Sequence, residues 1–418
     1  MTRTFAISSK GSLLLMLFSG IYISFIGKIF VAEIFFALLM LSLLLKNSHR
    51  AIVNQTQYKI VLKLLLMCQI GQITSDLIQD SAATKMLKGF LLILFISINF
   101  IVITHIIQFR LNRYLGAIIF FAVSQVVSYF FQPQLIEGAN AWKFGFGSPF
   151  TSIFFCWLTF NKKLNPTLIF SLSLFLSGID LLLGCRNLAG ITMLAGVLSA
   201  ISRAYVNTNQ LKADKFDMHS MLILSKKQPL ISFSIMLLTI SLTLLFSYQT
   251  AATKGWLGKE AYEKYILQTN AGKNLLLSSR SEVFSEYLAI RESPIIGHGS
   301  YAKLSPELRQ KLLPWLLENR LNPNLVELDS DNNYLIPVHS GLLTFWVWYG
   351  ILAIPFFIYV LSISISTIRS KNVPPILYYF AVLMCWDIFF SPFGMYARIQ
   401  YPLTLIGIIL FSKQKAAN

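Results

Sequence analysis

The chain has 418 residues, of which 55% are hydrophobic and only 13% are charged, and its mean hydropathy is +0.62. A water-soluble protein of this length could not cover its surface with so few charges, which excludes the ordinary soluble globular classes. The net charge of +17 would suggest nucleic-acid binding in a soluble protein, but in a membrane protein it first reflects orientation, so no nucleic-acid partner is expected.

Apolar runs near the ~20 residues needed to cross a hydrocarbon core recur along the whole chain. They predict an all-α, polytopic integral membrane protein with about twelve transmembrane helices. The expected spans are residues 12–27, 29–45, 58–74, 89–109, 114–132, 148–161, 166–183, 187–202, 229–249, 341–366, 374–391 and 399–412. The first run lacks a small-residue cleavage site and another run follows it directly, so we interpret it as a span rather than a signal peptide.

Basic residues are distributed unevenly between the segments that join these spans. With the N-terminus inside, the inside segments carry 18 Lys or Arg residues. The short outside segments carry six, which are Lys28, Lys85, Lys88, Lys143, Arg186 and Arg398. The positive-inside rule therefore predicts that both termini are cytoplasmic.

One long hydrophilic stretch, residues 250–338, falls between the ninth and tenth spans, on the outer face. It holds ten Lys or Arg and ten Asp or Glu residues and shows neither low complexity nor a Gly/Ser bias. We therefore expect a folded loop rather than a disordered one. The chain divides into transmembrane helices at 1–249, a loop subdomain at 250–338 and the last transmembrane helices at 339–418.

The loop contains patterns for two helices. In "RSEVFSEYLAIRE", one helix face would carry Arg280, Phe284, Tyr287, Leu288 and Arg291. Pro294 and the Gly-His-Gly turn of "SPIIGHGSY" end that helix. The second pattern, "SPELRQKLLPWLLENRL", has Ser305 as the expected N-cap and Pro306 at the first helical position.

Charged groups at membrane depth are costly and are often functional. Arg186 interrupts two apolar runs so briefly that it must lie at the outer edge of the bilayer, close to Asp180. Arg186 is either a residue of an interfacial turn or of an ion pair with Asp180, or it faces a cavity and binds an anion. Asp387 is either the counterion of an arginine or a helix-packing group, and we assign it no chemistry.

Two of the five histidines, His298 and His339, lie on the expected outer side. His298 stands between two glycines, where packing or capping is the commoner role. His339 comes just before the tryptophan-rich segment "FWVWY", which is typical of a membrane interface. It is either an interfacial cap or a catalytic base, because a neutral imidazole suits proton abstraction near pH 7.

The sequence gives little support for a metal site or a cofactor. The acidic pair Asp329 and Asp331 lacks further partners at ligand spacing and is interpreted as a solvated turn. The four cysteines lie within or beside apolar runs without metal or disulfide spacing, so they are expected as small core residues. The outer side instead offers Arg186, Arg280 and Arg291 for a diphosphate and His339 for a proton.

Three local patterns, in this order and spacing, resemble the O-antigen ligase and O-antigen polymerase superfamily of bacterial envelope glycosyltransferases. "GCRNLAGITMLAGV" is similar to that family's Arg followed by small residues that open a span. "SRSEVFSEYLAIRESPIIGHGSY" is similar to its Arg, aromatic and "sP-x-x-G-x-G" run. "HSGLLTFWVWYGI" is similar to its "H-[NS]-x-x-L" motif with Gly eleven positions after the His, here His339 and Gly350. Ser340 and Trp348 depart from the family's commoner residues at their positions.

The resemblance implies a glycosyltransferase of the bacterial inner membrane whose active site faces the periplasm. Its donor would be a saccharide on undecaprenyl diphosphate, with the diphosphate held by Arg186, Arg280 and Arg291. His339 would accept a proton from the acceptor hydroxyl, with inversion and without a metal or cofactor. Expected partners are this lipid-linked oligosaccharide and membrane lipids, with a chain-length regulator or other polysaccharide assembly proteins as candidates.

Several functions remain open at this point. We favour a polymerase, in which the acceptor is another lipid-linked repeat unit. In a ligase the acceptor is the lipid A core or a protein. A lipid-linked saccharide transporter would place polar groups at the midplane and often shows internal repeats, neither of which is apparent. A scaffold without chemistry would leave the arginines and His339 individually dispensable.

Overall fold

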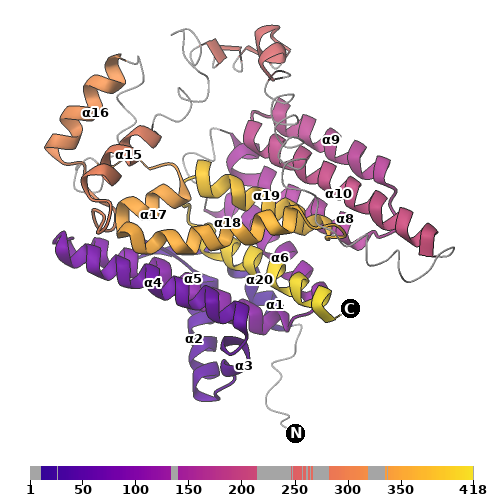
Figure 1. Cartoon of the computed structure of the whole chain (residues 1–418), viewed down its shortest axis with the longest axis horizontal. Coiled ribbons are helices and arrows are strands. Elements are labelled where there is room, and N and C mark those ends of the chain that lie inside the picture. Colours follow the sequence, from indigo (N-terminus) through magenta and orange to yellow (C-terminus); the bar gives the residue numbers. More distant parts are fainter. Residues whose placement is uncertain are drawn as a thin grey trace.

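The protein is described here by a computed structural model covering residues 11–25, 27–132, 140–213, 246, 248–256, 258–259, 262–263, 265–266, 282–318, 335–336 and 338–417. It is mainly helical (Figure 1). The helices of the first half are α1 (Gly11–Leu14), η1 (Leu15–Phe18), α2 (Val31–Leu45), α3 (Arg50–Val53), α4 (Thr56–Ile78), α5 (Ala83–Ile107), α6 (Leu111–Phe131), η2 (Trp142–Phe146), α8 (Gly147–Phe160), α9 (Pro166–Leu182) and α10 (Arg186–Ala213). Those of the second half are α15 (Glu282–Glu292), α16 (Pro306–Glu318), α17 (Gly341–Tyr349), η4 (Gly350–Ala353), α18 (Ile354–Ile368), α19 (Pro375–Phe390) and α20 (Ala397–Ala417).

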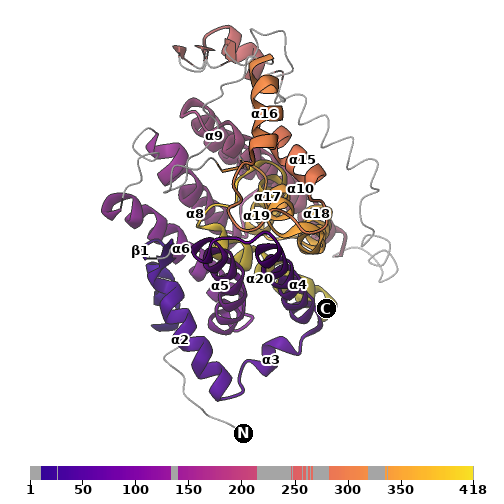
Figure 2. The ribbon, with the colours of Figure 1, turned by 90° about the vertical axis from the view of Figure 1, so that its left-hand side faces the viewer.

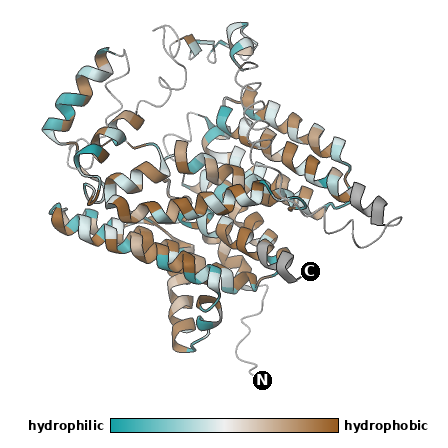
Figure 3. Cartoon of the chain, in the orientation of Figure 1, coloured by the Kyte–Doolittle hydropathy of each residue, from teal (hydrophilic) through white to brown (hydrophobic). Residues whose placement is uncertain are grey.

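Among the described residues, five helical segments are long and apolar enough by length and composition to cross a membrane, namely Thr56–Ile78, Ala83–Ile107, Leu111–Phe131, Arg186–Val206 and Gly341–Ile368, the last of which combines α17, η4 and α18. Four shorter apolar helices in the same part of the chain lie at Val31–Leu45, Pro166–Leu182, Pro375–Phe390 and Ala397–Phe411. Apolar residues dominate these helices over most of their length, whereas α16 is more hydrophilic (Figure 3). The helical, membrane-protein character expected from the composition therefore holds.

The expected first span, residues 12–27, is not one helix. Only the short turns α1 and η1 are helical, and they are followed by a hairpin of β1 (Tyr22–Ser24) and β2 (Lys28–Phe30), in which Tyr22 pairs with Phe30. The run "SGIYISFIGKIF" combines β-branched residues with two glycines, which weakens a helix and permits a hairpin. Gly27 has a φ of +95° in the turn. Hydropathy alone did not distinguish this hairpin from a span.

The expected tenth span, residues 341–366, is also not one straight helix. It divides at Gly350, whose φ of 68° and ψ of −161° end α17. The rings of Phe345 in α17 and Phe357 in α18 lie 5.1 Å apart, although twelve residues of continuous helix would separate them by roughly 18 Å. The two helices therefore fold back on one another, and Figure 1 shows α17 alongside the first part of α18.

The described part of the loop between the expected ninth and tenth spans contains two helices of eight residues or more. Helices α15 and α16 confirm the two patterns, and the Leu308 N–H donates to Ser305 Oγ over 3.1 Å, so Ser305 is the predicted N-cap. Both helices lie at the end of the molecule opposite α2 and α3 (Figures 1 and 2). The expected ninth span, residues 229–249, lies mostly outside the described residues.

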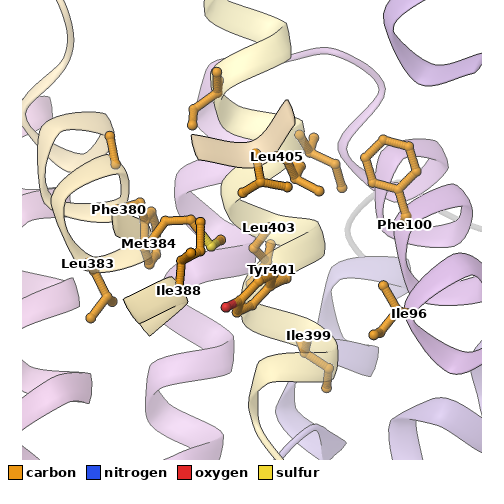
Figure 4. Close-up of a cluster of buried hydrophobic side chains, with 14 of the residues drawn as sticks. Ile96, Phe100, Phe380, Leu383, Met384, Ile388, Ile399, Tyr401, Leu403 and Leu405 are labelled. Atoms are coloured by element: carbon orange, nitrogen blue, oxygen red, sulfur yellow. The ribbon is translucent and has the colours of Figure 1, made fainter. Parts of the chain in front are cut away.

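The core is formed by apolar side chains between the helices. Figure 4 shows one part of it, where Phe380 and Met384 of α19 lie near Leu403 of α20, with Ile96 and Phe100 of α5 on the other side. The four cysteines are free thiols, of which Cys68, Cys156 and Cys185 are buried as expected and Cys385 is half-buried.

A buried ion pair joins the two ends of the chain. The Nη2 atom of Arg398, at the start of α20, lies 2.9 Å from Oε2 of Glu33 in α2. Glu33 also accepts from the backbone N–H of Phe30 at 3.0 Å, and Arg398 donates to the carbonyl oxygen of Lys28 at 2.7 Å. Because a buried pair requires such additional bonds, this network holds the hairpin against the last helix.

Candidate functional site

The turn of residues 293–300 is fixed on the end of α4 by side-chain hydrogen bonds. Oγ of Ser75 accepts from the N–H of Gly299 at 2.9 Å. The buried carboxylate of Asp76 accepts from the N–H and the hydroxyl of Ser300, at 2.6 and 2.7 Å. Nε2 of Gln79 donates to the carbonyl oxygen of Gly297 at 2.7 Å. A buried carboxylate with several donors holds a rigid position, so the turn has a defined place.

The same turn also packs on the break between α17 and α18. The N–H of Gly299 is 3.1 Å from the carbonyl oxygen of Trp348, and the N–H of Ile351 donates to Ile295 at 3.0 Å. A Cβ atom on Gly297 would lie 2.7 Å from the backbone nitrogen of Gly350, and one on Gly350 would overlap the Ile295 carbonyl. The turn that contains Gly297 and the segment around Gly350 therefore pack backbone against backbone. This close approach leaves no room for a side chain at either glycine.

His298 has a structural role in this turn. Its backbone N–H donates to the carbonyl oxygen of Val347 at 2.7 Å, and its Nε2 lies 2.7 Å from the carbonyl oxygen of Ala289 in α15. The imidazole therefore connects the end of α15 with the turn, and the packing interpretation of this histidine is confirmed.

His339 is half-buried just before α17. Its backbone N–H donates to Oε1 of Glu286 at 2.8 Å, and the N–H of Ser340 donates to the same atom at 3.2 Å. Glu286 belongs to α15 and is fully buried. Ser340 caps α17 by accepting from the N–H of Leu343 at 3.2 Å. Helix α15 and the N-cap of α17 thus fix the backbone from which His339 extends.

The three arginines expected near His339 have different positions. Arg291 is on α15 but is exposed, with its guanidinium 5.9 Å from the ring centre of Tyr287. Arg186 is half-buried at the start of α10, and its Nη1 donates to the hydroxyl of Tyr248 at 2.7 Å. Arg280 lies outside the described residues. The described contacts link Arg186 to Tyr248, at the end of the expected ninth span, and His339 to α15.

The two membrane-depth aspartates have neighbours other than arginine. Asp180 is buried and accepts from Trp142 Nε1 at 2.9 Å and from Thr192 Oγ1 at 3.0 Å. These hydrogen bonds support a helix-packing role rather than a pair with Arg186. Asp387 accepts from Nε2 of Gln400 at 3.0 Å, which joins α19 to α20.

A second polar site is a pocket of about 190 Å³, which the sequence did not indicate. Its cationic lining residues are Lys28, Lys88 and Arg398, and the ring of Tyr301 also lines it. Burial raises the pKa of the Tyr301 phenol above its ordinary value, and the charge of Arg398 offsets part of this rise. The three cations were among the six basic residues assigned to the outer segments. Their convergence required the tertiary fold, because they come from three distant parts of the chain.

Within the described ranges, no group of three or more His, Cys, Asp or Glu side chains could hold a metal ion. The fold and these sites define a helical protein of membrane type with polar sites where the loop meets the helices. No family model matches the chain, and neither a curated protein nor a solved structure is significantly similar to it. The resemblance drawn from the sequence motifs therefore stays a prediction.

Proposed function

We propose that the chain is a polymerase of O-antigen or a related surface polysaccharide. It would join repeat units carried on undecaprenyl diphosphate at the periplasmic face of the bacterial inner membrane. The observation that supports this proposal best is the meeting of two sequence patterns, in which the turn at Gly297 packs on Gly350. In the same region, Glu286 of α15 fixes the backbone of His339.

In the proposed reaction, His339 accepts a proton from a hydroxyl group of the acceptor saccharide. The hydroxyl oxygen attacks the anomeric carbon of the donor saccharide, and the bond from that carbon to the diphosphate oxygen breaks. Undecaprenyl diphosphate leaves with the electron pair, and the configuration at the anomeric carbon inverts. Arg186, with Arg280 and Arg291 as further candidates, would stabilise the negative charge on the leaving diphosphate.

Replacement of His339 tests this mechanism. We expect His339→Ala and His339→Gln to lower the transfer rate by about 10²- to 10⁴-fold, because neither side chain can act as a base of suitable strength. The measurement is mass spectrometry of products formed by purified protein from a lipid-linked oligosaccharide. His49→Ala is the control, since His49 is a histidine outside the proposed site, with its Nδ1 3.2 Å from the carbonyl oxygen of Leu43. Normal transfer by both His339 variants would refute the assignment.

The same assay separates the competing functions. A polymerase extends one lipid-linked unit with another and gives a ladder of products, whereas a ligase requires lipid A core or a protein as acceptor. A transporter moves the labelled lipid across vesicles without forming a bond. If products appear only when the lipid A core is present, the protein is a ligase and the polymerase proposal is wrong.

A further inference from the structure

The pocket beside Tyr301 is formed by segments that lie far apart in sequence. The β1–β2 turn contributes Lys28, α5 contributes Lys88, and α20 contributes Arg398. The remaining lining residues are Gly27, Ile29, Leu91, Leu92, Phe95 and Tyr301. Three of the four lining residues on α5 are apolar and the fourth is Lys88, so apolar and cationic groups lie side by side on this helix.

The positive charge at this pocket is only partly compensated. Glu33 neutralises Arg398 at 2.9 Å. Lys28 and Lys88 are both half-buried and, in the described part of the chain, neither forms an ion pair. Their ammonium groups lie instead near the rings of Tyr22 and Tyr301, at 4.8 and 5.9 Å from the ring centres. Two like charges at one cavity repel each other, and an anion between them would remove this cost.

The donors that face an anion here are suited to phosphate. Each ammonium group offers three N–H donors, and the Nε–H of Arg398 is buried without a partner among the described residues. Charge-assisted hydrogen bonds of this kind are the strong ones in anion recognition. Next to them, Leu91, Leu92 and Phe95 offer an apolar surface that a free inorganic anion would not use.

We propose that this pocket binds the phosphate or diphosphate group of a membrane lipid, with Lys28 and Lys88 as its ligands and Arg398 as a supporting donor. The lipid chain extends along the apolar side chains of α5. This site is separate from the diphosphate site expected at Arg186, and it does not rest on the proposed glycosyl transfer.

Binding measurements on the full-length protein in detergent test this proposal. The probes are farnesyl diphosphate, short-chain phosphatidylglycerol and inorganic pyrophosphate, and the background carries Arg186→Gln so that the arginine site does not contribute. We expect Lys28→Gln/Lys88→Gln to weaken the binding of at least one lipid probe by tenfold or more, because it removes two charge-assisted hydrogen bonds. Lys143→Gln is the matched control, since Lys143 is an exposed cation that does not line the pocket.

The probes distinguish the sources of the phosphate group. Tightest binding of farnesyl diphosphate assigns the pocket to a prenyl diphosphate, and tightest binding of phosphatidylglycerol assigns it to an ordinary phospholipid. Equal affinity for pyrophosphate and both lipids would overturn the lipid assignment. Unchanged affinity in the double lysine variant would overturn the whole site. If that variant unfolds at lower temperature than the control, Lys88→Gln alone replaces it.

The outcome is independent of the proposed reaction. Binding of the lipid probes by the His339→Ala variant measures the pocket without any transfer step. Loss of transfer with retained probe binding would leave this inference intact. The lysine variant could lose probe binding while transfer to soluble acceptors is unaffected. That result would support the lipid site and would not bear on the polymerase proposal.

Discussion

At the scale of single residues, Glu286 is the group that fixes the backbone of His339. Its carboxylate is fully buried and accepts from two consecutive backbone N–H groups, those of His339 and Ser340. In the sequence it stands between aromatic residues on an expected loop helix, where an acidic residue normally faces solvent. Nothing in the pattern around it indicates a partner 53 residues away.

Replacement of Glu286 should therefore affect both stability and the position of His339. Glu286→Ala leaves two backbone donors without their acceptor, which we expect to cost about 2 kcal/mol of unfolding free energy. Glu286→Gln keeps an acceptor oxygen of the same shape and should cost less. Thermal unfolding of both variants in one detergent measures the difference. If the alanine and glutamine variants unfold at the same temperature, these hydrogen bonds do not fix the segment.

The candidate site was only partly predictable from residues. His339 and Arg186 could be singled out because a titratable or charged group beside an apolar run is unusual. Arg291 could be singled out because it shares one face of an expected loop helix with aromatic residues. Their mutual positions depend on the contacts of α15 and the loop, which no local pattern encodes. The lysine pocket shows the same limit, since Lys28 and Lys88 each look like an ordinary interfacial residue in the sequence.

At the scale of elements, long uniform helices were predicted well and interrupted ones were not. The expected spans 58–74, 89–109 and 114–132 correspond to α4, α5 and α6, with boundaries that differ by a few residues. The break at Gly350 escaped detection because the residues on both sides are apolar and favourable in a membrane helix. A local signal was present, since Pro355 in the first turn of α18 cannot continue a helix from Ile351. The turn at residues 295–299 then packs on Gly350, which no local pattern indicates.

Substitution of Gly350 tests this explanation. Its φ of 68° and ψ of −161° lie in a region that is essentially restricted to glycine, and a Cβ atom would overlap the carbonyl of Ile295. We expect Gly350→Ala to cost about 2 kcal/mol or more and to release the turn, which increased proteolysis after residue 292 would report.

Gly190→Ala is the control for that experiment. Gly190 lies in α10, and no atom lies within 4 Å of an added Cβ atom. Alanine favours a helix over glycine by about 1 kcal/mol, so this variant should be at least as stable as the parent. If the Gly350→Ala protein is as stable and as resistant to protease as the Gly190→Ala protein, the packing of the turn at residues 295–299 on residue 350 does not require glycine there.

At the scale of the whole molecule, segments that the sequence assigns to the same side of the membrane contact one another. The turn at residues 297–300 lies against the end of α4, Ser340 donates to the carbonyl of Ile388 at 2.8 Å, and Arg398 contacts the β1–β2 turn. All these segments were assigned to the outer side from the distribution of Lys and Arg. At the other ends of the helices, Ile376 donates to Thr159 at 3.1 Å and Val373 to Ser202 at 3.2 Å.

Cysteine labelling measures this orientation directly. In a Cys385→Ala background, whose remaining cysteines are buried, we expect Glu307→Cys to react with a membrane-impermeant maleimide added to intact cells. Lys162→Cys, which is exposed between α8 and α9, should react only after permeabilisation. The reverse pattern would place the loop in the cytoplasm and remove the periplasmic reaction.

The short helix α17 separates the two sites by a fixed length. His339 precedes its N-cap Ser340, and the ring of Trp348 in its last turn lies 4.7 Å from the ring of Tyr301 of the pocket, tilted against it. Eight residues of helix span roughly 12 Å. A donor's anomeric carbon is bonded to its own diphosphate and cannot react that far from it, whereas a hydroxyl on a distal sugar can. A saccharide lipid held in the pocket would therefore reach His339 as the acceptor, and α17 would set which sugar along its chain is extended.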